Sequence, residues 1–82
     1  GVSDISQKGN VLRLQLGVFH PQALVAVCGQ AKYRQRLTLA AGEAPALSLK
    51  LKPGEDVLEA ARTLVEDLRL ATEEVSAPPP AP

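Results

Sequence analysis

The residues with reactive side chains are few, and their spacing fits no catalytic or metal-binding pattern. The 82-residue chain has one histidine, one cysteine, one tyrosine and one phenylalanine, which are His20, Cys28, Tyr33 and Phe19. A metal site needs several imidazole or thiolate ligands, and a nucleophile needs a base within hydrogen-bond reach. No phosphate-binding loop of the GxxxxGK or GxGxxG type is present. We therefore expect a binding or regulatory domain, not an enzyme, with no cofactor and no bound metal.

The lone histidine and cysteine have structural explanations. His20 precedes a proline at the expected start of a helix, so we expect it in a loop or capping position. Cys28 lies in an apolar segment, where a free cysteine behaves as a small core residue. Neither residue is expected to act as a nucleophile or a ligand.

Composition and charge narrow the class of protein. The chain contains nine basic and nine acidic residues, and no apolar run approaches the roughly 18 residues of a membrane-spanning helix. No basic segment followed by an apolar one opens the chain, so we expect no secretory signal. A single cysteine cannot form an internal disulfide. The absence of disulfides is typical of proteins in a reducing compartment. We expect one small, monomeric, cytoplasmic domain without membrane contact.

Alternation of leucine with polar residues predicts the strands. Four segments have a strand pattern, the first weaker than the others: residues 2–6, 11–16, 33–39 and 46–52. A turn over residues 8–10, with Gly9 and Asn10, would join the first two strands. Residues 40–45 would join the last two. The sequence thus predicts two hairpins.

Two segments have helical patterns. Residues 20–29 are mostly apolar, and Pro21 suits the first turn of a short buried helix. Between residues 57 and 71, apolar residues recur at intervals of three and four and form one stripe. Glu73 and Glu74 oppose the dipole of this helix, so we expect its last turn to fray. Two ion pairs are expected on its polar face, Glu59–Arg62 and Glu66–Arg69.

The element order is therefore β-β-α-β-β-α. Each clear strand has one leucine face, and both helices need an apolar surface to pack against. The simplest arrangement is a two-layer α+β domain, a four-stranded sheet with two helices on one face. We expect this domain to cover residues 1–74 and a disordered proline-rich tail to cover 75–82.

Charge is unevenly distributed along the chain. Residues 1–54 contain seven Lys or Arg and two Asp or Glu, whereas residues 55–82 contain two and seven, so the net charges are +5 and −5. The eight residues on the outward faces of the clear strands include five basic and no acidic ones: Arg13, Gln15, Arg34, Arg36, Thr38, Ser48, Lys50 and Lys52. The sequence predicts a basic sheet face and an acidic last helix.

The candidate contact residues on this basic face are Arg34, Arg36, Lys50 and Lys52. They would contact an acidic protein surface or a phosphate backbone. A solvated face that protects the edge strands from aggregation is the alternative. No aromatic residue on these faces could stack on a base, so sequence-specific RNA recognition is not expected.

Several of these segments resemble the extreme C-terminus of bacterial transcription-repair coupling factor (Mfd). The matching features cover residues 1 to about 72. They are GVSDIS, then GNVLRLQL, Pro21 opening an apolar helix, the strand over residues 33–39, LSLKL, and a final amphipathic helix. The family also has a helical region with an acidic-Leu-Asp-Arg-Phe-Gly motif, which is absent from these residues.

The resemblance implies a regulatory domain. In this family the domain packs against the protein's own repair-factor-binding domain, masks the surface for the damage-recognition protein UvrA, and restrains the motor until RNA polymerase is engaged. The parent protein would be an ATP-dependent DNA translocase, but no helicase motif lies in these 82 residues. The alternative from the residues alone is a small module that binds a nucleic-acid backbone through the basic face.

Overall fold

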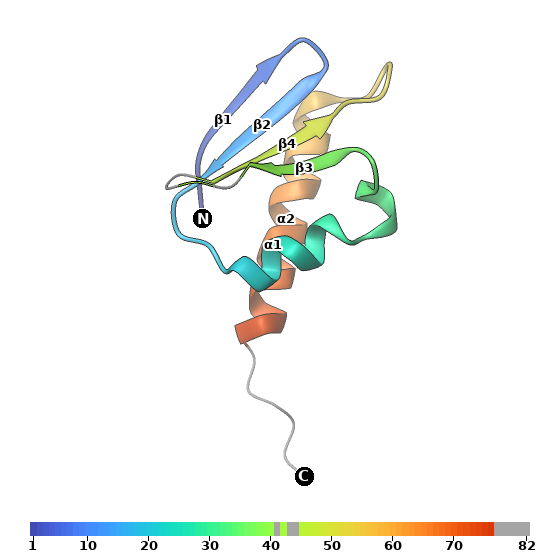
Figure 1. Cartoon of the computed structure of the whole chain (residues 1–82). Helices are drawn as coiled ribbons and strands as arrows, with labels where there is room; N and C mark the ends of the chain where they lie inside the picture. Colours follow the sequence, from blue (N-terminus) through green and yellow to red (C-terminus); the bar gives the residue numbers. More distant parts are fainter. Residues whose placement is uncertain (41, 43–44, 77–82) are drawn as a thin grey trace.

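Two β-hairpins form a four-stranded antiparallel sheet in the computed structural model, which describes residues 1–40, 42 and 45–76 (Figure 1). The first hairpin joins β1 (Val2–Lys8) to β2 (Val11–Leu16), and the second joins β3 (Leu37–Ala40) to β4 (Ala46–Lys50). Pairing of β2 with β4 gives the strand order β1-β2-β4-β3. Both predicted hairpins are confirmed.

Glycine permits two of the turns that connect these elements. Gly9, in the turn between β1 and β2, has a φ of 60°, which is in the left-handed region. Gly54 lies between β4 and the second helix with a φ of 77°. A side chain at either position would crowd its own backbone, so both turns favour glycine.

The leucines of the two central strands form the core together with both helices. Four of them pair across β2 and β4 and are at most 2% exposed: Leu12, Leu14, Leu47 and Leu49. The helices α1 (Pro21–Cys28) and α2 (Val57–Ser76) bury Val27 and Leu64 in the same cluster. Each such side chain stabilises the fold by roughly 1.5–3 kcal/mol. Both helices therefore lie on the leucine face, and the predicted two-layer α+β fold is confirmed.

The strand predicted from residue 33 begins four residues later, at Leu37. Ala31–Tyr33 instead form a short 3₁₀ turn, η1, in which Tyr33 is buried with the core. Gln35 has a φ of 65°, and the Arg36 amide donates to the Tyr33 carbonyl at 3.0 Å. This turn breaks the extended backbone, so Arg34 lies in a loop and not on a strand face.

Helix α2 extends past the predicted end of the domain. It reaches Ser76, so the tail predicted from residue 75 is wrong for Val75 and Ser76, and residues 77–82 lie outside the described residues. The last turn, which was expected to fray, is helical in the structure. Arg69 forms an ion pair with Glu73 at 2.7 Å, which offsets the unfavourable charge at this helix end.

The polar face of α2 holds one of the two expected i,i+3 ion pairs. Arg69 pairs with Glu66, but Arg62 makes no ion pair within the described part of the chain, so the pair expected with Glu59 is not formed. In residues 1–40, 42 and 45–76, no helix combines the length and the apolar character that crossing a membrane requires.

Candidate interaction surface

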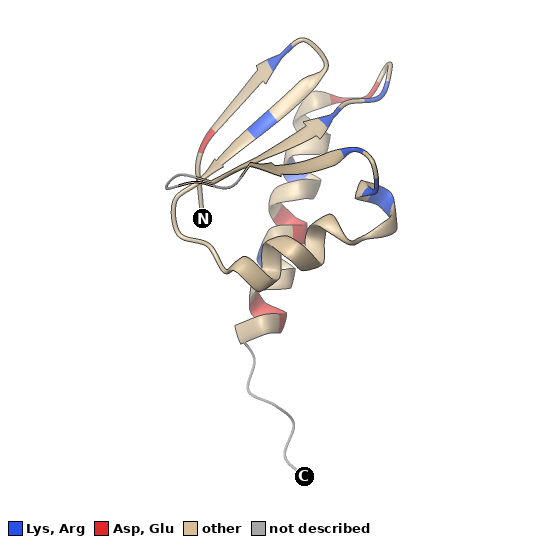
Figure 2. Cartoon of the chain, in the orientation of Figure 1, with Lys and Arg blue, Asp and Glu red and all other residues tan. Residues whose placement is uncertain are grey.

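Three basic residues lie on neighbouring strands of the sheet (Figure 2). The pairing register places all three on the outer face, opposite the helices. Lys8 on β1 and Lys50 on β4 both pair with Val11 of β2, so the two lysines lie in one row. Strands lie about 4.8 Å apart, which places these two backbone positions roughly 10 Å apart. Arg13 lies on the same face, two residues after Val11 on β2. Its neighbours on β1 and β4 are Ser6 and Ser48. We name Lys8, Arg13 and Lys50 the outer basic patch.

The outer basic patch is exposed to solvent. All three residues are exposed, and none forms an ion pair within the described ranges 1–40, 42 and 45–76. Asp4 pairs with Gln15 at the far end of the same face and is the acidic residue on the β1 edge. The outer basic patch therefore presents like charges that an acidic surface would neutralise.

The four residues predicted from the sequence do not form one surface. Lys50 belongs to the outer basic patch, whereas Arg34 and Lys52 are exposed in loops. Arg36 is half-buried and lies on the helix side, where its Nη2 atom is 2.5 Å from Glu55 Oε1. Its Nε atom also donates to the Lys50 carbonyl at 3.1 Å. The prediction that Arg36 lies on the open sheet face is therefore wrong: Arg36 precedes β3, and its side chain lies beside Glu55 and Ala60 on the helix side.

Glu55 precedes α2 and accepts hydrogen bonds from the Arg36 side chain and from the Lys52 amide. These contacts join the start of β3 to the loop between β4 and α2.

Sequence reasoning missed Lys8, which was assigned to a turn. The strand pairing extends to Lys8, and Gly9 and Asn10 alone form the turn. A two-residue turn with glycine is typical of hairpins, so counting back from it would have placed Lys8 on the face of Arg13.

A second polar cluster joins η1 to α2 on the helix side. The buried Tyr33 hydroxyl donates a hydrogen bond to the Asp67 carboxylate. Lys32 pairs with the same carboxylate at 2.8 Å, and its Nζ atom lies 5.3 Å from the centre of the Tyr33 ring. Burial raises the pKa of the Tyr33 phenol, and the hydrogen bond to Asp67 raises it further. Tyr33 is thus held as a neutral donor, and the cluster is a structural contact between η1 and α2.

The reactive side chains named from the sequence are not assembled into a site. Burial raises the pKa of the Cys28 thiol, which favours the protonated, unreactive form. His20 precedes the first turn of α1 and makes no side-chain capping bond there. Within the described part of the chain, no three histidine, cysteine or acidic residues come together in a way that could hold a metal ion.

Comparisons of the chain with protein-family models, with curated proteins and with solved structures found no match.

Proposed function

We propose that this chain is a non-catalytic docking domain of a bacterial transcription-repair coupling factor. In this role it covers the UvrA-binding surface of the same protein and restrains the motor until RNA polymerase is engaged. The observation that carries the docking role is the open outer sheet face, on which Lys8, Arg13 and Lys50 lie exposed in neighbouring strands.

The residues that resemble the coupling-factor family occupy defined places in the fold. Val2 and Ile5 of the opening segment lie in β1, and Gly9 makes the left-handed turn before β2. Pro21 is the first residue of α1. These positions support the family assignment because each explains a residue type that the resemblance rests on.

The charge distribution suits reversible docking. The outer basic patch lies on the sheet, whereas most acidic residues lie on and before α2, on the other side of the domain (Figure 2). Complementary charge orients two surfaces and accelerates their encounter while adding limited affinity. A domain that covers the UvrA-binding surface must leave it when the motor is engaged. It therefore needs an interface that forms quickly but binds with limited affinity.

The test reverses two charges of the outer basic patch in the full-length parent protein. Arg13→Glu and Lys50→Glu together should weaken the docking of this domain on the UvrA-binding surface. The affinity of the parent protein for UvrA should therefore rise. Exposed charge pairs contribute 0.2–1 kcal/mol each, so affinity should rise between about twofold and about thirtyfold. Biolayer interferometry with immobilised UvrA measures this change.

The matched control is Glu74→Lys, an exposed charge reversal near the end of α2. It should leave the affinity for UvrA unchanged. Equal affinity in the wild-type and the doubly reversed protein would refute the assignment of this face. An equal rise in UvrA affinity in the Glu74→Lys control would indicate a general charge effect. That result would also refute the assignment of this face.

Binding to a nucleic-acid backbone is the second candidate, and the same three exposed cations favour it. Three phosphate contacts predict that log affinity falls with log salt at a slope of about −2.7. Absence of a duplex or single-strand band shift at about 50 mM salt would exclude this function. Tyr33 is buried, so it offers no ring for base stacking on this face.

A further inference from the structure

The strand β1 forms one edge of the sheet, and none of the described residues pairs with its outer side (Figure 1). Every residue of β1 after Val2 is exposed. The other edge strand, β3, has four residues, whereas β1 has seven. An edge strand carries a row of unpaired backbone N–H and C=O groups that can pair with a further strand. The edge of β1 is therefore the longer of the two places where this sheet can be extended.

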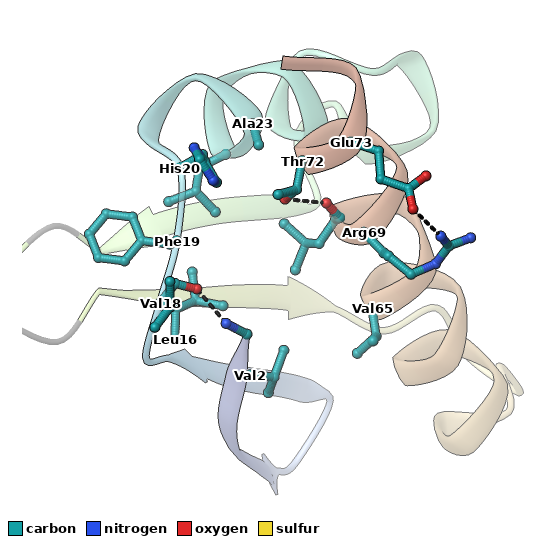
Figure 3. Close-up of a pocket in the computed structure, with 13 residues that line it drawn as sticks. Val2, Leu16, Val18, Phe19, His20, Ala23, Val65, Arg69, Thr72 and Glu73 are labelled. Atoms are coloured by element: carbon teal, nitrogen blue, oxygen red, sulfur yellow. Dashed lines mark hydrogen bonds and ion pairs between the residues drawn. The ribbon is translucent and has the colours of Figure 1, made fainter. Parts of the chain in front are cut away.

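The first residues of β1 are held against the body of the domain. The Gly1 amine donates a hydrogen bond to the Val18 carbonyl (Figure 3). Val2 lines a cavity of about 410 Å³ between the start of β1 and α2. The pairing of β1 with β2 shifts in register between Val2 and Asp4. The regularly paired, open part of the edge is therefore residues 4–8.

The hydrogen bonds of β2 show which backbone groups of residues 4–8 are free. The Leu16 amide donates to the Pro45 carbonyl at 2.9 Å, on the β4 side of the strand. Successive residues of a strand direct their N–H and C=O groups to opposite sides, so the odd-numbered residues of β2 bond toward β1. Their partners there are the even-numbered residues. Ile5 and Gln7 lie between these and direct their N–H and C=O groups away from the sheet.

Two opposite charges flank the centre of this open part. Asp4 and Lys8 are exposed on the outer face, each two residues from Ser6. Neither forms an ion pair in the part of the chain that the structure describes. If two copies align antiparallel with Ser6 opposite Ser6, Asp4 of each copy lies opposite Lys8 of the other. The edge is therefore complementary to itself about a two-fold axis.

The same register pairs the free backbone groups. With Ser6 at the axis, Ile5 of one copy lies opposite Gln7 of the other, and the outward N–H and C=O groups of both residues bond. Asp4 and Lys8 then form non-hydrogen-bonded pairs, in which the side chains lie closest. A shift by two residues separates the opposite charges, and a shift by one places different faces together. Charge and hydrogen bonding therefore favour one register.

The inner face adds an apolar contact in this register. Ile5 pairs with Leu14 and therefore lies on the helix side of the sheet. Leu14 is fully buried beneath the helices, whereas Ile5 is 47% exposed. The two Ile5 residues are diagonal neighbours across the axis, about 7–8 Å apart, which is within reach of their side chains. Pairing of two copies would therefore shield both isoleucines from water.

We propose that the chain binds a second copy of itself through β1, which joins two four-stranded sheets into one of eight strands. Asp4 of each copy pairs with Lys8 of the other, and Ile5 and Gln7 supply the backbone hydrogen bonds. This contact does not depend on the proposed function, because it lies at the edge of the sheet and not across its outer face. The alternative is that Lys8 protects the edge from pairing, in which case the chain stays monomeric.

Sedimentation equilibrium of the chain at concentrations up to about 1 mM measures the association. Asp4→Lys and Lys8→Asp each convert both ion pairs into like charges. The loss of two exposed ion pairs should raise the dissociation constant between about twofold and about thirtyfold, and repulsion should raise it further. The double variant should restore the wild-type constant. An equimolar mixture of the two single variants should form a mixed dimer, because the lysines of one chain then face the aspartates of the other.

A control and a second measurement separate edge pairing from a general charge effect. Glu74→Lys makes the same charge change as Asp4→Lys at an exposed position on α2 and should leave the constant unchanged. Amide hydrogen exchange should slow at Ile5 and Gln7 as the concentration rises, whereas the Ser6 amide, which bonds to β2, should be protected throughout. Retained dispersion of the amide spectrum verifies that each variant is folded.

Four results would overturn the proposal. A chain that stays monomeric up to about 1 mM would show that the edge does not pair. Association that neither single variant weakens would contradict the pairing of Asp4 with Lys8, as would a mixture of the two variants that forms no mixed dimer. Association without added protection at Ile5 and Gln7 would place the contact elsewhere on the chain.

Discussion

Removing the hydroxyl of Tyr33 tests whether the contact between η1 and α2 stabilises the domain. Tyr33→Phe keeps the buried ring but deletes the hydrogen bond to Asp67. A hydrogen bond to a charged group contributes a net 1.5–3 kcal/mol. Asp67 retains its ion pair with Lys32 at 2.8 Å, so we expect the lower part of this range, about 1.5–2 kcal/mol.

Urea unfolding at 25 °C, followed by circular dichroism, measures the loss of unfolding free energy. For a domain of this size, 1 kcal/mol corresponds to about 4–8 °C in Tm, so the melting temperature should fall by roughly 6–16 °C. Lys32→Met is the control, because Lys32 is half-exposed and its ion pair should contribute less than about 1 kcal/mol. A Tyr33→Phe loss below about 0.5 kcal/mol, or no larger than that of the control, would refute the reasoning.

The same variant has a characteristic dependence on pH. The pKa of Tyr33 is raised in the folded protein by burial and by the hydrogen bond to Asp67. Above the ordinary tyrosine pKa of about 10, the unfolded chain therefore loses the phenolic proton while the folded chain keeps it. The unfolding free energy of the wild type should then fall by up to about 1.4 kcal/mol per pH unit from this group. Tyr33→Phe lacks this contribution, so the stability difference between the two proteins should narrow as the pH rises above about 10.

Three further substitutions test the packing, the turn and the ion pair that the structure describes. Leu64→Ala should cost about 2–5 kcal/mol in urea unfolding because Leu64 is fully buried, while Leu58→Ala on the exposed flank should stay within about 0.5 kcal/mol. Gly54→Ala should cost about 1 kcal/mol, since a φ of 77° is unfavourable for alanine, and an unchanged midpoint would contradict the turn geometry. Arg36→Gln removes the ion pair with Glu55 and should lower the free energy of unfolding by about 1 kcal/mol, which corresponds to several degrees in melting temperature. Arg34→Gln in the exposed loop should have no measurable effect.

The sequence predicted those parts of the fold that depend on local pattern. Alternating leucines identified β2 and β4, Gly9 marked the first turn, and the apolar stripe identified α2. These elements follow from periodicity and from turn chemistry, which act over a few residues. The two-layer arrangement followed because both helices and the leucine faces needed apolar partners.

The errors arose where contacts distant in sequence decided the structure. Tyr33 shares the alternating pattern of a strand, but its hydroxyl bonds to Asp67, 34 residues away, and its ring is buried in the core. The sequence pattern predicted Arg36 as an exposed cation, but the fold brings Glu55 beside it and the two form an ion pair. Tertiary contacts thus overrode local propensity at both residues, and no single-sequence pattern reports them.

The strand order has a consequence for the rate at which this domain folds. Each hairpin contains only local pairings, and an isolated two-stranded hairpin is marginally stable at best. The pairing of β2 with β4 brings the Leu16 amide to the Pro45 carbonyl at 2.9 Å. It closes a loop of about 30 residues that contains α1, η1 and β3. The entropy of closing such a loop costs about 3 kcal/mol before any contact across it forms. Formation of the central strand pair should therefore limit the folding rate, and the two hairpins should gain lasting structure only when they join.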